Sequence, residues 1–345
     1  MWSRSRRLGT LEAERGERGL RLAKRLLARE RGAVAEALNL VDDRRPEARA
    51  AALALLIELE QALGFGGPPR VGLSGPPGVG KSTLLDALVR RARARGETVG
   101  ILAVDPSSRR SGGALLGDRL RVRASARDPG VFLRSLAARE RLGGLAESAR
   151  AGLFVLAAAF DLVLIETVGV GQSESEVADL VDTLVWVAQP GAGDLLQYMK
   201  AGVLELPDVV AVNKADLGAI AERTANELAA GLSLAERAED WSPPVVRISA
   251  RDGSGLADLE DALARHRAWL AQHDRLSERR RRGRDAAIRD FLAREHGRVG
   301  VEAVGGLAAL DETLRREPDT SGFALAVRLG EVIEAALRSR SGVGR

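Results

Sequence analysis

Residues 75–83, Gly-Pro-Pro-Gly-Val-Gly-Lys-Ser-Thr, decide the fold class of this chain. They follow the short aliphatic run Val71–Ser74, which predicts a strand, and we expect a helix to begin at Lys81. A strand, a loop of the form G-x-x-x-x-G-K-[ST] and a helix, in that order, are typical of the phosphate-binding loop of P-loop proteins. Backbone N–H groups of such a loop surround phosphate oxygens, and the helix N-terminus adds a partial positive charge. The sequence therefore predicts a nucleotide site formed by Gly75, Pro76, Pro77, Gly78, Val79, Gly80, Lys81, Ser82 and Thr83.

Two side chains of this loop have distinct predicted roles. Lys81 is expected to reach the β- and γ-phosphates and to act in catalysis, and Ser82 is expected to bind Mg²⁺. Lysine is rare in this chain, because among 52 basic residues only Lys24, Lys81, Lys200 and Lys214 are not arginine. A lysine in such a background indicates a position where a compact ammonium group is needed.

A second motif predicts which base the nucleotide carries. Asn213-Lys214-Ala215-Asp216 follows the aliphatic run Val209–Val212 and matches the N-K-x-D box of GTPases. The aspartate of that box accepts hydrogen bonds from guanine N1–H and N2–H₂, and adenine would leave it facing a lone pair. A third stretch, residues 249–251, follows the last aliphatic run and matches the Ser-Ala pair that supports guanine O6. The predicted guanine contacts are Asn213, Lys214, Asp216, Ser249, Ala250 and Arg251.

Three carboxylates are candidates for the side of the site that faces Mg²⁺ and the γ-phosphate. Glu166 follows the run Leu162–Ile165 within Glu-Thr-Val-Gly, at the position where most GTPases carry Asp-x-x-Gly. Asp105 ends the run Val99–Val104, and Asp118 lies in the glycine-bounded loop that follows. Glu166 and Asp105 are predicted to be catalytic, since a carboxylate there can bind the metal or orient the attacking water. The predicted metal ligands are Ser82, Asp105, Asp118 and Glu166.

The rest of the chain predicts the architecture around these motifs. Short aliphatic runs alternate with helical segments, which indicates a parallel sheet with both faces buried by helices. We expect an α/β P-loop NTPase with a helical extension over 1–67, a GTPase domain over 68–272 and a helical arm over 273–345. Pro46 is expected to separate two helices of the extension. The predicted strands are Val71–Ser74, Val99–Val104, Leu162–Ile165, Leu184–Val187, Val209–Val212 and Val245–Ile248.

Composition excludes several function classes. The 345 residues include no cysteine and three histidines, so thiolate metal sites, cysteine nucleophiles and a histidine-rich metal site are not expected. The longest apolar run, residues 151–160, is too short to cross a bilayer, and we expect a soluble, cytoplasmic protein. The net charge is +4, and the arginine block Arg279–Arg282 is interpreted as a solvated helix face. Nucleic-acid binding is not expected, because no aromatic residues for base stacking are interleaved with the block.

Taken together, the motifs resemble the methylmalonyl-CoA mutase-associated GTPases of the MeaB/ArgK type. Besides the phosphate loop and the N-K-x-D box, the resemblance lies in residues 104–108, 111–118, 142–145, 166–174 and 190–194. It implies a GTP-dependent chaperone that gates cofactor delivery to an adenosylcobalamin-dependent acyl-CoA mutase and protects or reactivates that enzyme. It also implies a SIMIBI-type fold, a homodimer formed by the C-terminal helices, and cobalamin bound by the partner. The residues that the resemblance assigns to partner coupling are Asp194, Gln197 and Lys200.

Other functions stay open at this point. A nickel-insertion GTPase belongs to the same class, but it would need Cys or His ligands at metal spacing. A P-loop kinase linked to amino-acid transport would pass the γ-phosphoryl group to an acceptor instead of water. Val170 stands where small GTPases often carry a glutamine that orients water, so we expect GTP hydrolysis to be slow until a partner accelerates it.

Overall fold

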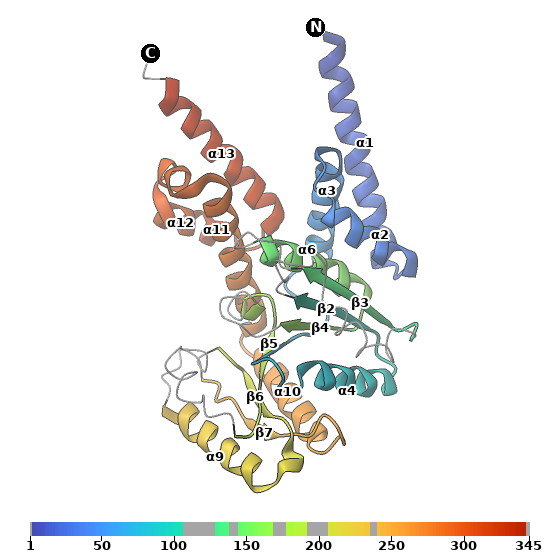
Figure 1. The fold of residues 1–345 in the computed structure, drawn as a ribbon. Helices are drawn as coiled ribbons and strands as arrows, with labels where there is room; N and C mark the ends of the chain where they lie inside the picture. The colour runs from blue at the N-terminus through green and yellow to red at the C-terminus, as the bar shows by residue number, and fades with distance from the viewer. Residues whose placement is uncertain are drawn as a thin grey trace. The chain divides into compact units, whose positions relative to one another are not determined.

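Seven parallel strands form the sheet on which the predicted motifs lie, in the order β3-β2-β4-β1-β5-β6-β7. The computed structural model describes residues 2–105, 128–137, 144–167, 177–191, 206–234 and 240–342. In these ranges each predicted strand lies within two residues of an observed one, and the α/β P-loop fold class is confirmed (Figure 1). The strands are β1 (Arg70–Ser74), β2 (Val99–Asp105), β3 (Val131–Ala137), β4 (Leu162–Thr167), β5 (Thr183–Ala188), β6 (Val209–Val212) and β7 (Val245–Arg247).

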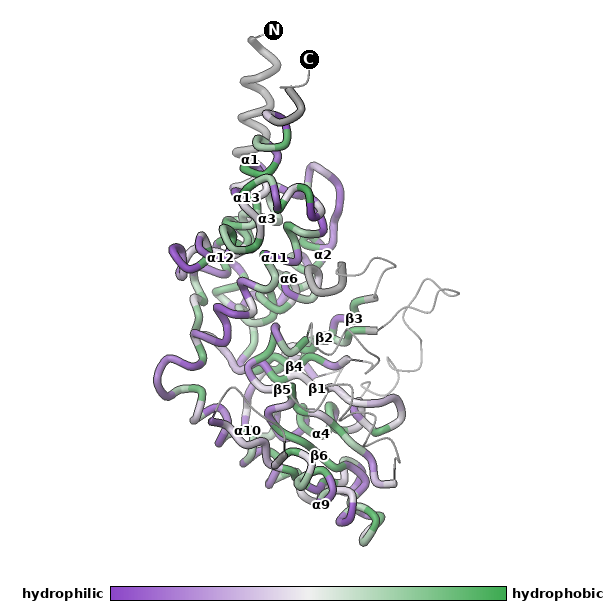
Figure 2. The backbone as a smooth tube through the Cα atoms, turned by 90° about the vertical axis from the view of Figure 1, so that its left-hand side faces the viewer, coloured by the Kyte–Doolittle hydropathy of each residue, from purple (hydrophilic) through white to green (hydrophobic). Residues whose placement is uncertain are grey.

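Strand β3 is the one strand of this sheet that the sequence did not predict. It lies at the edge of the sheet and pairs only with β2, so most of its side chains are half-buried. The polar pair Arg134 and Ser135 interrupts its apolar residues, and the continuous aliphatic run that marked the inner strands is missing. The inner strands β5 and β6 are buried at every position, and Figure 2 colours the strands mostly as hydrophobic.

Helices cover both faces of the sheet in the compact unit formed by Pro68–Glu140 and Phe160–Arg279, here called the sheet unit. Side chains of α4 (Lys81–Ala94) and α10 (Leu256–Leu270) pack with alternate residues of β1, β5 and β6 on one face. Side chains of α9 (Ala219–Leu234) pack with the intervening residues of β5 and β6 on the other. The alternation follows from the two-residue period of a strand.

The other compact unit, here called the helical unit, combines Met1–Gly67, Arg141–Ala159 and Arg280–Arg345. The N-terminal part has three helices instead of the two expected, because the chain turns once more before Arg31. Gly19 lets the first helix approach the third, since an added Cβ would lie 2.1 Å from the carbonyl oxygen of Ala51. Its helices are α1 (Trp2–Leu27), α2 (Arg31–Asp42), α3 (Pro46–Leu63), α6 (Gly144–Ala159), the part of α11 (Arg275–Ala303) from Arg280 onward, α12 (Gly306–Arg316) and α13 (Gly322–Gly342).

The interpretation of Arg279–Arg282 as a solvated helix face is wrong for Arg279, Arg280 and Arg281, whereas Arg282 is exposed. Arg279 forms two hydrogen bonds of 2.9 and 2.7 Å with the carboxylate of Asp208 in the sheet unit. Arg280 is buried and donates to the carbonyl groups of Phe65 and Gly66, and Arg281 lies over the Phe65 ring at 4.8 Å. These arginines donate hydrogen bonds to backbone carbonyls and a carboxylate. The run of charged residues in the sequence does not by itself indicate these partners.

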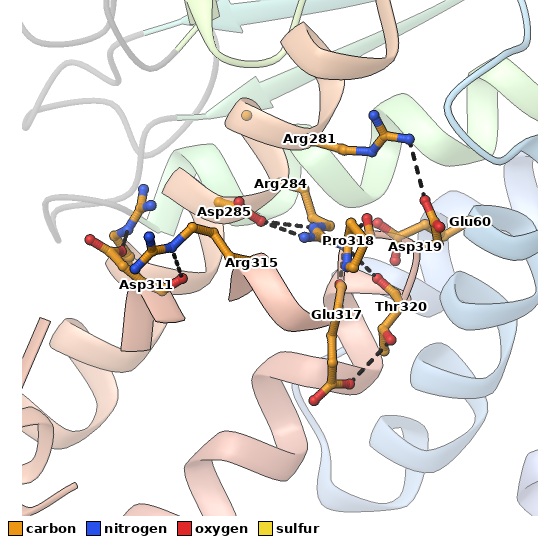
Figure 3. A network of polar contacts seen from close by, with 12 residues as sticks. Glu60, Arg281, Arg284, Asp285, Asp311, Arg315, Glu317, Pro318, Asp319 and Thr320 are labelled. Carbon is orange, nitrogen blue, oxygen red and sulfur yellow. Dashed lines mark hydrogen bonds and ion pairs between the residues drawn. The ribbon is translucent and has the colours of Figure 1, made fainter. Parts of the chain in front are cut away.

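Arg284 continues this pattern one turn later in α11. Its guanidinium donates to the carbonyl groups of Glu317, Pro318 and Thr320 at 2.6–3.0 Å, and thereby holds the turn between α12 and α13 (Figure 3). Glu60 of α3 holds the start of α13 from another side. Its carboxylate accepts hydrogen bonds from Arg150 at 3.0 Å, from the Ser321 hydroxyl at 2.6 Å and from the Phe323 N–H at 3.2 Å.

An aspartate stands immediately before each of three strands: Asp161 before β4, Asp182 before β5 and Asp208 before β6. Each carboxylate accepts a backbone hydrogen bond from the strand next to its own, or from the residue before that strand. These contacts tie neighbouring strands together at the amino edge of the sheet and leave the carboxyl edge to the nucleotide motifs. The donors, in the same order, are the N–H groups of Thr98, Arg70 and Leu184, at 2.9, 2.9 and 2.7 Å.

Within the described ranges we find no helix long and apolar enough to cross a membrane.

Candidate nucleotide site

The predicted phosphate loop lies between β1 and α4, and α4 begins at Lys81 as expected. Two of its glycines are required by close packing as well as by a positive φ. A Cβ on Gly75 (φ 134°) would lie 2.2 Å from the carbonyl oxygen of Val187, and one on Gly80 (φ 96°) would lie 2.4 Å from Nδ2 of Asn213. The loop is therefore packed tightly against the ends of β5 and β6, which no larger residue at these two positions would permit.

Lys81 directs its charge into the loop. Its side chain is buried, and Nζ donates to the carbonyl oxygens of Gly75 at 2.6 Å and Pro76 at 2.9 Å. An ammonium held by loop carbonyls lies where a phosphate-binding loop presents its positive charge. The Val79 side chain, in contrast, belongs to the hydrophobic core, so this residue can contribute only backbone groups to a ligand.

Ser82 and Glu166 come together from two elements. The Ser82 hydroxyl in the first turn of α4 donates to Oε1 of Glu166 near the end of β4 at 2.7 Å. The β1–β4 register causes this contact, because it pairs Glu166 with Leu73 just before the loop. The two side chains thus meet at the N-terminal end of α4, of which Lys81 is the first residue.

The Ser82 hydroxyl and the Glu166 carboxylate fit a Mg²⁺ ion that is bound by protein oxygens and by the phosphate oxygens of a nucleotide together. Mg²⁺ is commonly held by one or two protein oxygen ligands together with phosphate oxygens. Among the side chains that the structure describes, no group of three acidic, histidine or cysteine residues could hold a metal by itself. Asp105 ends β2, whose register pairs Val104 with Thr167, so its backbone lies on the strand next to Glu166. The Asp105 side chain is outside the described residues.

Asn213 joins three loops of the site. Its side chain is buried, with Nδ2 donating to the carbonyl oxygen of Val79 at 2.7 Å and Oδ1 accepting from the N–H of Ala250 at 3.0 Å. One amide therefore connects the phosphate loop, the N-K-x-D box and the Ser-Ala stretch. Asp216 is exposed at the start of a 3₁₀ turn, η3 (Ala215–Leu217), where its carboxylate is accessible to a base.

Lys214 has a left-handed backbone (φ 61°) and a side chain that crosses back to the phosphate loop. Its Nζ donates to the carbonyl oxygen of Gly78 at 3.1 Å and to Oε1 of Gln189 at 2.7 Å. Sequence analysis did not identify Gln189. It belongs to no motif, and its partner lies 25 residues further along the chain.

The Ser-Ala stretch is supported by a residue that sequence analysis also missed. Ser249 and Ala250 are buried, whereas Arg251 is exposed. Asp252 closes the turn, because its carboxylate accepts the N–H of Ser254 at 2.9 Å. That backbone hydrogen bond, with further bonds from the hydroxyls of Ser254 and Ser249, lowers the pKa of Asp252.

Four of the predicted functional residues lie outside the described residues: Asp118, Asp194, Gln197 and Lys200. Their roles in metal binding and partner coupling stay predictions.

Comparison with known proteins agrees with the motifs. Residues 34–298 match the family described as methylmalonyl Co-A mutase-associated GTPase MeaB. A protein of Mycobacterium tuberculosis named Probable GTPase is 44% identical over 256 residues, which cover 73% of this chain and 76% of that protein. The mouse protein named methylmalonic aciduria type A homolog, mitochondrial, is 38% identical over 255 residues, covering 70% of this chain and 61% of the mouse chain.

Among solved structures, one titled LAO/AO transport system kinase has the same fold. It superposes with a TM-score of 0.66 and 27% sequence identity, over 92% of this chain and 97% of its own.

Proposed function

The chain belongs to the methylmalonyl-CoA mutase-associated GTPase family, and on that premise we propose that it hydrolyses GTP to GDP and phosphate as a chaperone of an adenosylcobalamin-dependent acyl-CoA mutase. The observation that carries the nucleotide part is the single amide of Asn213, which joins the phosphate loop to both guanine motifs. The mutase part rests on the description of the family and on the name of the mouse relative.

In this proposal each described residue has one task. Lys81 neutralises charge on the β- and γ-phosphates, Asp216 selects guanine, and the stem of Lys214 lies against the base. Ser82 and Glu166, with Asp105, would hold Mg²⁺, which when bound neutralises charge that develops on the phosphates during hydrolysis. Glu166 accepts a hydrogen bond from Ser82, and the same carboxylate oxygen can accept one from a water in the metal shell.

The partner-dependent part of the proposal concerns other segments. We assign nucleotide chemistry to residues 68–272, dimerisation to the helical arm 273–345 and coupling to Asp194, Gln197 and Lys200. Cobalamin would be bound by the mutase and not by this chain. Because Val170 replaces a water-orienting glutamine, hydrolysis by the isolated chain is expected to be slow, and the mutase is expected to accelerate it.

Phosphate release from GTP, measured with and without candidate mutases, tests this function. We expect slow release by the chain alone, faster release with the cognate mutase, and co-purification of the two proteins. Phosphate that appears only when an amino acid or protein acceptor is added, and is found on that acceptor, would instead support a kinase. GTP turnover of many per second without any partner would contradict the proposed dependence on a partner.

A further inference from the structure

Lys214 is fixed at both ends of its side chain. Its backbone adopts the left-handed conformation, which few residues other than glycine adopt, and its ammonium is held by Gly78 and Gln189. We propose that Gln189 is a positioning residue that orders the Lys214 stem and thereby sets the affinity of the site for guanine nucleotides. This inference rests on the proposed GTP-binding function.

Strand pairing places Gln189 beside Lys214. Gln189 directly follows Ala188, the last residue of β5, and the β5–β6 register pairs Ala188 with Val212. The Asn213 N–H then donates to the Ala188 carbonyl oxygen at 2.9 Å, which extends the pairing by one residue. Gln189 is half-buried, so the side-chain amide and the ammonium meet where water is only partly excluded.

Two acceptors order the Lys214 side chain before a nucleotide binds. A lysine side chain has four rotatable bonds and loses much of its rotamer entropy when it is held in one conformation. The Gln189 amide oxygen accepts a charge-assisted hydrogen bond, which is stronger than one between neutral groups. With the ammonium held by two acceptors, the stem is ordered before a base arrives, and preorganisation of this kind raises affinity. Without Gln189 the stem would have to be ordered during binding.

The test is the Gln189→Ala variant, with GDP and a non-hydrolysable GTP analogue titrated by calorimetry. We expect the Kd of each nucleotide to rise by the same factor, about 3- to 10-fold for the loss of one partly exposed charge-assisted hydrogen bond. For GTP hydrolysis, KM should rise while kcat stays unchanged, because Lys214 is assigned to the base and not to the γ-phosphate. Unchanged Kd values for both nucleotides would overturn the proposal.

Three further variants separate positioning from general loss of structure. Gln189→Glu keeps an acceptor for the ammonium and should retain wild-type affinity, and Gln272→Ala, at an exposed glutamine in the turn after α10, should have no effect. In a Lys214→Met background, which keeps an apolar stem without an ammonium, Gln189→Ala should cause no additional loss. Additive losses in that double variant would show that Gln189 acts independently of Lys214, and would also overturn the proposal.

Failure of this inference and failure of the proposed function give different results. If the wild-type chain binds GDP and GTP no better than ADP and ATP, the proposed function fails. If the wild-type chain selects guanine nucleotides and Gln189→Ala binds them equally well, only the positioning role fails. Thermal unfolding without nucleotide identifies a variant that has not folded, and Gln189→Met then replaces Gln189→Ala in the same titrations.

Discussion

Asn213 illustrates how much of the candidate site depends on one residue. It is 3% exposed, and its amide satisfies two backbone groups in loops that lie far apart in the chain. Leaving a buried backbone group without its hydrogen-bond partner costs about 1–3 kcal/mol. The two hydrogen bonds of the Asn213 amide therefore contribute substantially to holding the three loops in their relative positions. Asp216, three residues later, has the opposite environment, because it is exposed and free of any role in the core.

This difference makes Asp216→Asn the cleanest test of base recognition. We expect GTP to bind about 100-fold more weakly or worse, since two hydrogen bonds to a charged acceptor are lost, each worth about 1.5–3 kcal/mol. Xanthine nucleotides should bind better than in the wild type, because the C2 carbonyl that replaces the guanine amine accepts a hydrogen bond from the asparagine amide. Competition between GDP and XDP for a fluorescent nucleotide measures both effects. Asp258→Asn, at an exposed position in α10, is the control, and unaltered GTP affinity in Asp216→Asn would refute the assignment.

At the scale of elements, α4 and α10 are tied by one carboxylate. Glu260 of α10 accepts hydrogen bonds from Arg91 of α4 at 2.7 Å and from Arg95, the C-cap residue of that helix, at 2.5 Å. Partial burial raises the pKa of Glu260, but the hydrogen bonds from the two arginines outweigh it, and the net result is a lowered pKa. Because α4 carries Lys81 and Ser82, this contact supports the helix on which the phosphate loop depends.

The lowered pKa predicts how this contact responds to acid. The unfolded chain binds a proton at Glu260 more readily than the folded chain, so the contribution is present above the unfolded pKa and is lost as pH falls through the folded one. Both arginines are more than 40% exposed, which limits the contribution to about 0.5–1 kcal/mol. Urea unfolding should show Glu260→Gln less stable than the wild type by this amount at pH 7, with the difference shrinking as the pH falls below about 4.5 and lost below the folded pKa. Glu227→Gln, at an exposed position on α9, is the control, and a pH-independent difference would contradict the prediction.

The elements also show what the sequence could and could not predict. Inner strands were recognised because burial on both faces requires a continuous apolar run, whereas β3 at the sheet edge has no such requirement. The nucleotide motifs were recognised because their residues are consecutive. Gln189 and the arginines of α11 act on partners distant in the chain, and those contacts exist only once the fold brings the segments together.

At the scale of the whole molecule, two clusters hold the helical unit together. Arg284 is 2% exposed and holds the turn that begins α13, and Glu60 joins α3, α6 and the start of α13. The Glu60 cluster connects early and late parts of the chain, whereas Arg284 connects α11 to the turn between α12 and α13 (Figure 3). The hydrogen bonds that the described residues of the nucleotide motifs make, in contrast, lie within the sheet unit.

We therefore expect Arg284→Ala to destabilise the helical unit without weakening nucleotide binding. The loss of a buried charged donor that serves three carbonyl groups should cost about 3 kcal/mol or more. Hydrogen exchange should become faster in α12 and α13, while the Kd for GDP stays at its wild-type value. Arg298→Ala, just beyond the kink at Gly297 in α11 and at a side chain that is 92% exposed, should change neither measurement. Slow exchange in α13 of the Arg284→Ala variant would contradict the role given to this arginine.

The discontinuity of the helical unit has a consequence for how the chain is made. The ribosome completes the sheet unit at Arg279, whereas the helical unit lacks the last of its three segments until Arg280–Arg345 emerges. At about 5–20 residues per second this interval lasts several seconds. During that time Leu56 and Phe154 have yet to meet Phe323, with which they pack in the finished protein. A nascent chain with a complete sheet unit and uncovered N-terminal helices is thus the species on which cellular folding factors would act.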